Sequence, residues 1–138
     1  MERGTAGASV CAFFRSWFTR RSVDEAAAFL TEDARFIGPG KTGQARGRAA
    51  VIEYIRREIL QMREPRSCAV SDLSEQEIAP GVRNVSMELA LGNGVQGHVL
   101  RVFCTLVQEA ADWRIRSIHV ALRDAGGAEA ARPLPETV

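Results

Sequence analysis

The chain has 138 residues, of which 46% are hydrophobic and 25% are charged. These values are typical of one globular domain and argue against a disordered chain or a membrane span. Eighteen basic residues balance seventeen acidic ones, so the net charge of +1 provides no general attraction for nucleic acid or for an anionic membrane. We therefore expect one soluble domain with neither nucleic acid nor membrane as a partner.

The cysteines and the first residues bear on cofactors and location. Cys11, Cys68 and Cys104 are far apart in the sequence and form no C-x-x-C pair. This spacing predicts neither a disulfide framework nor a zinc site, and we expect neither a metal nor a cofactor. The first apolar run is interrupted by Arg15 before it reaches the length of a signal-peptide core. These features favour the reducing cytoplasm as the location.

Three helices are predicted in the first half of the chain. After a flexible segment at residues 1–8, the first helix starts at Ser9, and its large apolar residues recur three and four positions apart: Val10, Phe13, Phe14, Trp17 and Phe18. Ser22 and Glu25 have the spacing of a capping box, which predicts a second, short helix after Ser22. Residues 47–62 repeat the helical spacing and predict the third and longest helix.

The rest of the chain is predicted to form strands. A short strand is expected at residues 34–37, between the second and third helices. After the third helix, residues 66–77 are weakly strand-like, and residues 82–91, 96–108 and 113–122 have the alternation or the apolar content of long strands. Helices followed by a run of strands are typical of an α+β domain.

The final segment of the chain differs in composition from the strands before it. Residues 125–138 are rich in glycine, alanine and proline, and we expect a loosely packed or disordered tail. No internal repeat or linker divides the remainder. The ordered domain is therefore expected to span residues 9–124.

This order of elements resembles that of the nuclear transport factor 2-like superfamily, and within it the SnoaL-like branch. Residues 30–38 resemble the family stretch L-x-x-D-x-x-W/F-I-G, Gly47 resembles the glycine that opens the third helix, and residues 113–119 resemble the closing strand W-R-I-x-H-x-H-x-S. The resemblance implies a cone-like, curved antiparallel sheet covered by three helices, which enclose a small-molecule pocket. It does not imply one activity, because the superfamily includes isomerases, cyclases, dehydratases and non-catalytic modules.

The ketosteroid isomerase branch of the superfamily can be compared residue by residue. Against its pattern, Phe14 stands at the position of the oxyanion-hole tyrosine, and Gly38 stands at that of the general-base aspartate. A phenyl ring cannot donate a hydrogen bond and glycine cannot accept a proton. We therefore expect no catalysis of the ketosteroid isomerase type.

The polar candidates for the pocket depend on the alternation in the last strands. There Ser117 and His119 share a face with Trp113, which the resemblance places inside the cone. His119 is the best candidate for an acid, a base or a hydrogen-bond donor, and a buried structural histidine is the alternative. Arg101 alternates with Phe103, so both are expected to face the ligand, and the alternative for Arg101 is a solvent-facing position.

Large apolar residues are expected to form the wall of this pocket: Phe14, Trp17, Phe18, Phe36, Tyr54 and Met87. Each of them is otherwise explained as part of the core. The leading hypothesis is a domain that binds a small hydrophobic or amphipathic molecule. One alternative is a cofactor-independent isomerase, cyclase or dehydratase that uses His119, and another is a non-catalytic dimerisation or assembly module.

A second copy of the chain is the expected protein partner. Alternation places a row of apolar residues on the outer face of the sheet: Leu100, Val102, Cys104, Leu106, Ile118, Val120 and Leu122. Monomers rarely expose an apolar patch of this size. The sequence therefore predicts a twofold homodimer through the outer sheet face.

Overall fold

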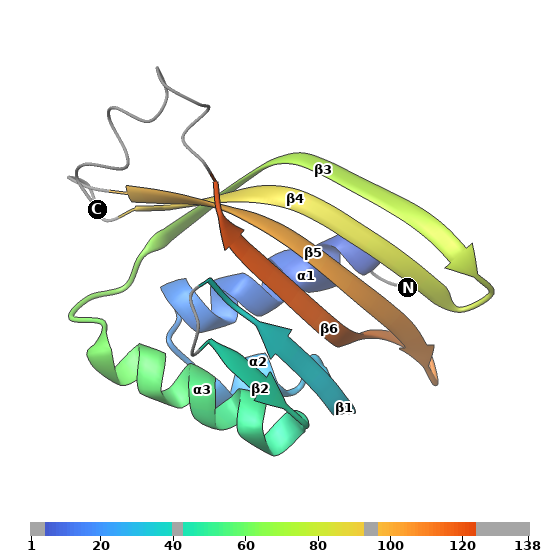
Figure 1. The fold of residues 1–138 in the computed structure, drawn as a ribbon, viewed down its shortest axis with the longest axis horizontal. Helices are drawn as coiled ribbons and strands as arrows, with labels where there is room; N and C mark the ends of the chain where they lie inside the picture. Colours follow the sequence, from blue (N-terminus) through green and yellow to red (C-terminus); the bar gives the residue numbers. More distant parts are fainter. Residues whose placement is uncertain (1–4, 40–42, 93–96, 124–138) are drawn as a thin grey trace.

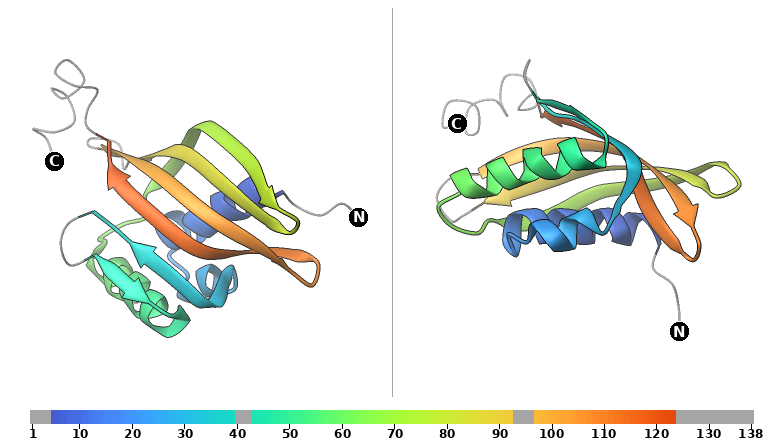
Figure 2. Two further views of the ribbon diagram at one scale, coloured as in Figure 1. Left: turned by 45° about the vertical axis from the view of Figure 1, so that its right-hand side comes forward. Right: turned by 90° about the horizontal axis from the view of Figure 1, so that it is seen from below.

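The structure is a computed structural model that describes residues 5–39, 43–92 and 97–123. Helices and strands follow in the order α1, η1, α2, β1, β2, α3 and then β3 to β6. The helices lie against one face of a single curved sheet (Figures 1 and 2). Buried residues from the helices and the sheet together form the hydrophobic core. The tail predicted for residues 125–138 lies outside the described residues.

The first helix starts earlier than its apolar spacing predicted. Helix α1 spans Ala6–Phe14, and the side chain of Thr5 caps it by accepting a hydrogen bond from the Ala8 amide at 3.0 Å. Residues 6–8, which we placed in the flexible segment, are therefore helical. The chain continues as a π-helical turn, η1, over Arg15–Thr19. Because this turn is wider than an α-helix, it shifts the residues after Phe14 around the helix axis.

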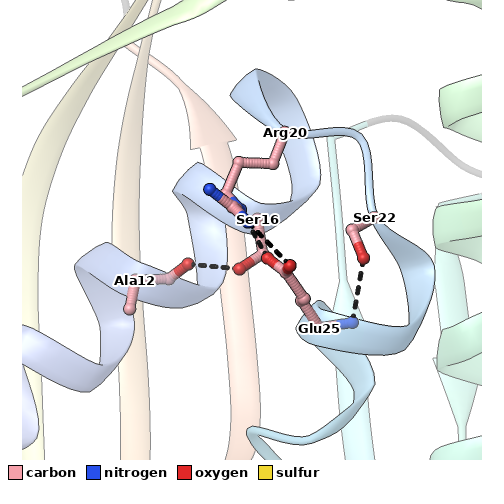
Figure 3. A network of polar contacts seen from close by, with 5 residues as sticks. All are labelled: Ala12, Ser16, Arg20, Ser22 and Glu25. Atoms are coloured by element: carbon pink, nitrogen blue, oxygen red, sulfur yellow. Dashed lines mark hydrogen bonds and ion pairs between the residues drawn. The ribbon is translucent and has the colours of Figure 1, made fainter.

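A polar network joins η1 to the second helix. Helix α2 spans Val23–Ala27, and Ser22 caps it by accepting a hydrogen bond from the Glu25 amide at 3.2 Å, as the capping pattern predicted. Two nitrogens of Arg20 donate to the Glu25 carboxylate, and the Ser16 hydroxyl donates to the Ala12 carbonyl (Figure 3). The Arg20 hydrogen bond lowers the pKa of the Glu25 carboxyl below its usual value.

The third helix has the extent that its periodicity predicted. Helix α3 spans Arg48–Gln61, and its N-cap residue is Gly47 with a φ of 90°. Residues with a side chain rarely adopt this angle, which explains the glycine. Val51 and Ile55, one turn apart on α3, are fully buried in the core.

The sheet has six strands in the order β2–β1–β6–β5–β4–β3. Their bounds are Leu30–Ile37 for β1, Gln44–Arg46 for β2, Ser67–Ala79 for β3, Val82–Gly92 for β4, Gly97–Glu109 for β5 and Asp112–Leu122 for β6. The last four strands pair antiparallel in chain order, as expected. Strand β1 pairs in parallel with β6, so the sheet is mixed, and the short strand β2 was not predicted.

Strand β6 contains one residue more than its partner at a single point. Thr105 of β5 pairs with Ser117, whereas the next residue, Leu106, pairs with Ile115. Arg116 is thus the extra residue of a β-bulge. A bulge interrupts the alternation of side chains, so the residues after Arg116 face the side opposite to the one that strict alternation predicts.

The bulge overturns the predicted orientation of Ser117 and His119. Ile118 and Val120 point into the core, with exposed fractions of 1% and 4%. Ser117 and His119 alternate with them and lie on the outer face, where His119 is exposed. The prediction that Ser117 and His119 lie inside the cone is therefore wrong.

Strand β5 also faces the other way from the prediction, although the extra residue lies in β6. Residues paired across antiparallel strands point to the same side of the sheet, so Phe103, the partner of His119, also faces outward. The apolar row that we expected on the outer face is instead mostly buried in the core: Leu100, Val102, Cys104, Leu106, Ile118 and Val120. From that row only Leu122, with 56% of its surface exposed, lies outside the core.

Candidate functional site

An aromatic cavity of about 160 Å³ lies between the helices and the inner face of the sheet. Its wall combines residues from α1, η1, β1, α3 and the strands β4 to β6: Phe14, Trp17, Phe18, Phe36, Pro39, Tyr54, Glu58, Arg66, Leu91, His98, Leu100 and Val120. Five of the aromatic residues expected in the pocket wall are among them. Met87, the sixth expected wall residue, is buried but does not line this cavity.

The aromatic rings of α1 and η1 form a stack along one wall. The Trp17 ring is nearly parallel to Phe18, with centroids 4.7 Å apart, and to Phe14, with centroids 5.9 Å apart. The rings of Phe36 and Tyr54 come from β1 and α3, and their centroids are also 4.7 Å apart. Trp17 meets both of these rings edge to face. The cavity thus offers flat aromatic surfaces in two orientations, which suit a planar apolar group.

Trp17 also provides a donor without an acceptor. Its indole nitrogen, Nε1, is buried, and no hydrogen-bond partner for it exists among the residues that the structure describes. Leaving a buried donor unpaired costs about 1–3 kcal/mol. An acceptor oxygen on a molecule in the cavity would remove this cost if it approached the indole N–H.

Arg66 brings a positive charge to the cavity. Its backbone is fixed, because the Arg66 amide donates to the Phe18 carbonyl at 2.9 Å and the Thr19 hydroxyl donates to the Arg66 carbonyl at 2.7 Å. Within the described ranges its guanidinium forms no ion pair and no side-chain hydrogen bond. The charge is therefore available to a ligand.

Two further polar groups of the cavity have shifted pKa values. Partial burial, and then the charge of Arg66, lower the pKa of His98 below its usual value, which favours the neutral imidazole. Partial burial, and then the charge of Glu58, raise the pKa of the Tyr54 phenol, which therefore stays protonated and can donate. The cavity thus combines a neutral imidazole, a phenol, a guanidinium and a carboxylate at an apolar wall.

Sequence reasoning missed Glu58, Arg66 and His98 as pocket residues. His98 lies two positions before Leu100, so the two share a face of β5. We placed Leu100 on the outer face of the sheet, and the same alternation excluded His98 from the pocket. Glu58 lies four residues after Tyr54 on α3. Residues at this spacing are neighbours on a helix surface, so the position of Glu58 beside Tyr54 could have been predicted.

The remaining predicted site residues lie on the outer face of the sheet. Arg101 donates to Glu88 at 2.8 Å. A hollow of about 320 Å³ on the same face includes Phe103, Ser117 and His119 among its lining residues. These three residues are brought together, but on the opposite side of the sheet from the aromatic cavity.

Both positions compared with ketosteroid isomerases lie at the aromatic cavity. Phe14 lines it, and Gly38 is buried beside it. A Cβ atom at Gly38 would lie 2.9 Å from the Phe36 ring and 3.3 Å from the Tyr54 oxygen. These positions thus hold a phenyl ring and a residue without any side chain.

In the part of the chain that the structure describes, no group of three or more His, Cys, Asp or Glu residues is arranged to hold a metal ion. Burial raises the pKa of Cys11, Cys68 and Cys104, which makes these thiols weak nucleophiles at neutral pH. None of the described helices has the length and apolar character needed to cross a membrane.

The curved sheet, the helices on its inner face and the cavity between them form the cystatin-like fold that NTF2-like proteins share. Residues 8–122 match the model of the SnoaL-like domain. The chain therefore belongs to the SnoaL-like family. No curated protein shows significant similarity to the sequence.

The solved structures that share this fold have names that refer to different functions. A provisionally named calcium/calmodulin-dependent protein kinase type II association domain from Thiobacillus denitrificans has a TM-score of 0.76 and 20% identity, over 88% of this chain and 98% of that one. A provisionally named dehydratase of the NTF2-like family from Streptomyces avermitilis has a TM-score of 0.73 and 13% identity, over 84% of this chain and 92% of that one. A provisionally named scytalone dehydratase from Novosphingobium aromaticivorans has a TM-score of 0.68 and 16% identity, over 83% of this chain and 79% of that one. Identities this low show a shared fold alone.

Proposed function

We propose that this protein binds a small, largely apolar molecule in the aromatic cavity. The observation that supports the proposal best is the convergence of five aromatic side chains, Trp17 among them, around one space. An apolar wall with a few polar groups is the usual composition of a small-molecule site. The dehydratases among the structural neighbours are in keeping with such a site.

Ligand binding can be measured through Trp17. The chain has two tryptophans, so Trp113→Phe leaves Trp17 as the single tryptophan. Titration with toluene and with phenol is expected to change its fluorescence in a saturable way and to shift its indole N–H resonance. The absence of a saturable response to both compounds would contradict the proposal.

Two phenylalanine variants separate binding in the cavity from nonspecific binding to the protein surface. Val120→Phe adds a ring at a residue that lines the cavity, so it should abolish the response to toluene. Ala121→Phe adds the same ring at the next residue, which is exposed, and should leave the response unchanged. Equal effects of the two variants would show that the compounds bind elsewhere.

The catalytic alternative that uses His119 stays a prediction. His119 lies on the outer face and does not line the aromatic cavity, so the two do not form one site. A substrate of His119 would have to bind in the outer hollow. The imidazole that does line the aromatic cavity is His98.

We also infer that a second copy of the chain covers the outer face of the sheet. Phe103 lies within this face with 46% of its surface exposed, between its cross-strand partners Ser86 and His119. The next cross-strand row, formed by Asn84, Thr105 and Ser117, carries no charge. An exposed aromatic residue among neutral polar ones is typical of the centre of a protein interface. Sedimentation is expected to give the mass of two chains, and the mass of one chain at micromolar concentration would contradict the inference.

A further inference from the structure

The size and charge of the aromatic cavity restrict what it can bind. We infer that its ligand is a single-ring compound bearing an anionic oxygen group, such as an aromatic carboxylate, and that Arg66 binds this group. The inference rests on the proposed function, because it concerns the same cavity. It adds the chemical class of the ligand and the residue that selects it.

The volume of the aromatic cavity limits the number of rings in a ligand that it can enclose. The cavity measures about 160 Å³. A protein cavity of about 150 Å³ is filled by one benzene molecule. One ring with a small substituent therefore fits inside the cavity, whereas three fused rings would extend beyond its opening. The wall suits one ring as well, since Trp17 and Phe18 are nearly parallel and Phe36 lies edge-on to Trp17.

Several side chains around this space can donate a hydrogen bond to a ligand. The Trp17 indole N–H has no partner, and the Arg66 guanidinium has no anion, among the residues that the structure describes. The protonated Tyr54 phenol adds a third donor. A ligand oxygen would satisfy one or more of these groups, and a negatively charged oxygen would form the stronger, charge-assisted bond with Arg66.

The two charged residues of the cavity, Arg66 and Glu58, interact with different polar residues. Arg66 acts on His98, whereas Glu58 acts on Tyr54 from the next turn of α3. A ligand carboxylate is attracted to the side of Arg66 and His98, and repelled from the side of Glu58. This arrangement gives an anionic ring compound one preferred orientation.

Three probes test charge and size together in the Trp113→Phe protein. Benzoate is the expected ligand class, benzamide is its neutral counterpart of the same shape, and anthracene-2-carboxylate has three fused rings. We expect benzoate to bind about tenfold more tightly than benzamide, because only benzoate forms a charge-assisted bond. Anthracene-2-carboxylate should show no saturable binding.

Variants at the two charges assign the selectivity to Arg66. Arg66→Gln should weaken benzoate binding by about tenfold and leave benzamide binding within about twofold. Arg63→Gln removes an exposed charge outside the cavity and should change neither. Glu58→Gln should bind benzoate at least as tightly as the parent protein. Circular dichroism of each variant confirms that the fold is retained.

The outcomes separate this inference from the proposed function. If toluene and phenol bind but benzoate has no advantage over benzamide, or if Arg66→Gln has no effect, the anionic ligand class is overturned and the cavity remains a binding site. If anthracene-2-carboxylate binds more tightly than benzoate, the size limit is overturned. If no compound binds, the proposed function fails as well.

Discussion

The indole of Trp17 belongs both to the core and to the candidate site. Its ring packs against Phe14 and Phe18 on one side and against Phe36 on another, with only 3% of the residue exposed. Its N–H has no acceptor in the described part of the protein. An acceptor atom that reached this N–H would remove the cost of leaving a buried donor unpaired.

Glu75 connects the start of the first helix to the sheet. One oxygen of its carboxylate accepts a hydrogen bond from the Gly7 amide at 2.8 Å, and the other accepts one from Arg83 at 3.1 Å. The Arg83 guanidinium in turn lies 5.4 Å from the centre of the Trp113 ring. The carboxylate therefore satisfies a free amide of the first helical turn and neutralises a partly buried cation.

Removal of this carboxylate should weaken the fold. We expect Glu75→Ala to lower the free energy of unfolding by about 1–2 kcal/mol, because the helix loses a cap and Arg83 loses its partner. Glu77→Ala, at an exposed residue of the same strand, should change it by less than about 0.5 kcal/mol. Urea denaturation measures both values, and similar losses would show that the Glu75 contacts contribute little.

At the scale of the elements, the bulge in β6 decides which side chains reach the core. Ile115 and Ile118 are both buried, although they are three positions apart in a strand. Arg116 between them is exposed, and its Nε atom lies 3.3 Å from Asp33. Exposed ion pairs contribute at most about 1 kcal/mol, so the importance of Arg116 lies in its presence as an extra residue.

Deletion of Arg116 should leave the facing of the later side chains unchanged. Without this extra residue, Ile115, Ser117 and Ile118 alternate regularly against β5, so Ile118 and Val120 still face the core and His119 still faces outward. We expect both the deletion and Arg116→Ala to lower the free energy of unfolding by less than about 2 kcal/mol. Thermal unfolding followed by circular dichroism compares the two proteins. A deletion that costs more than about 4 kcal/mol would show that the bulge itself is required.

At the scale of the whole molecule, the sheet separates two surfaces with different chemistry. Its inner face holds the aromatic cavity, and its outer face presents Phe103 and His119. Buried side chains of the same strands, among them Val102 and Ile118, face the inner side. Ligand binding and association of two copies are therefore expected to depend on different residues.

A substitution on the outer face tests this separation. Phe103→Asp introduces a charge at the proposed centre of the interface, so the dimer should dissociate at least tenfold more readily. The response of Trp17 to toluene should persist, because Phe103 does not line the cavity. Sedimentation and fluorescence measure the two properties separately. Loss of the toluene response together with the dimer would show that the cavity depends on the second copy.

Local patterns were sufficient to predict the helices and the aromatic wall. The capping pair Ser22 and Glu25 marked the start of α2, and the spacing of apolar residues marked α3. Phe14, Trp17 and Phe18 could be assigned to one helical face because residues three and four positions apart lie together on a helix. The α1 start was missed, since Thr5 caps the helix without a strong apolar pattern behind it.

The sequence by itself determined the α+β order, the family and the aromatic residues of the cavity, because these follow from contacts between residues close along the chain or from motifs. The tertiary structure alone decided which face of β5 and β6 meets the helices. In β6 that choice depends on the extra residue Arg116, whose place is fixed by pairing with β5 rather than by its neighbours in sequence. For the same physical reason Arg66 and His98, far apart in the chain, were recognised as parts of one site only after the strands were paired.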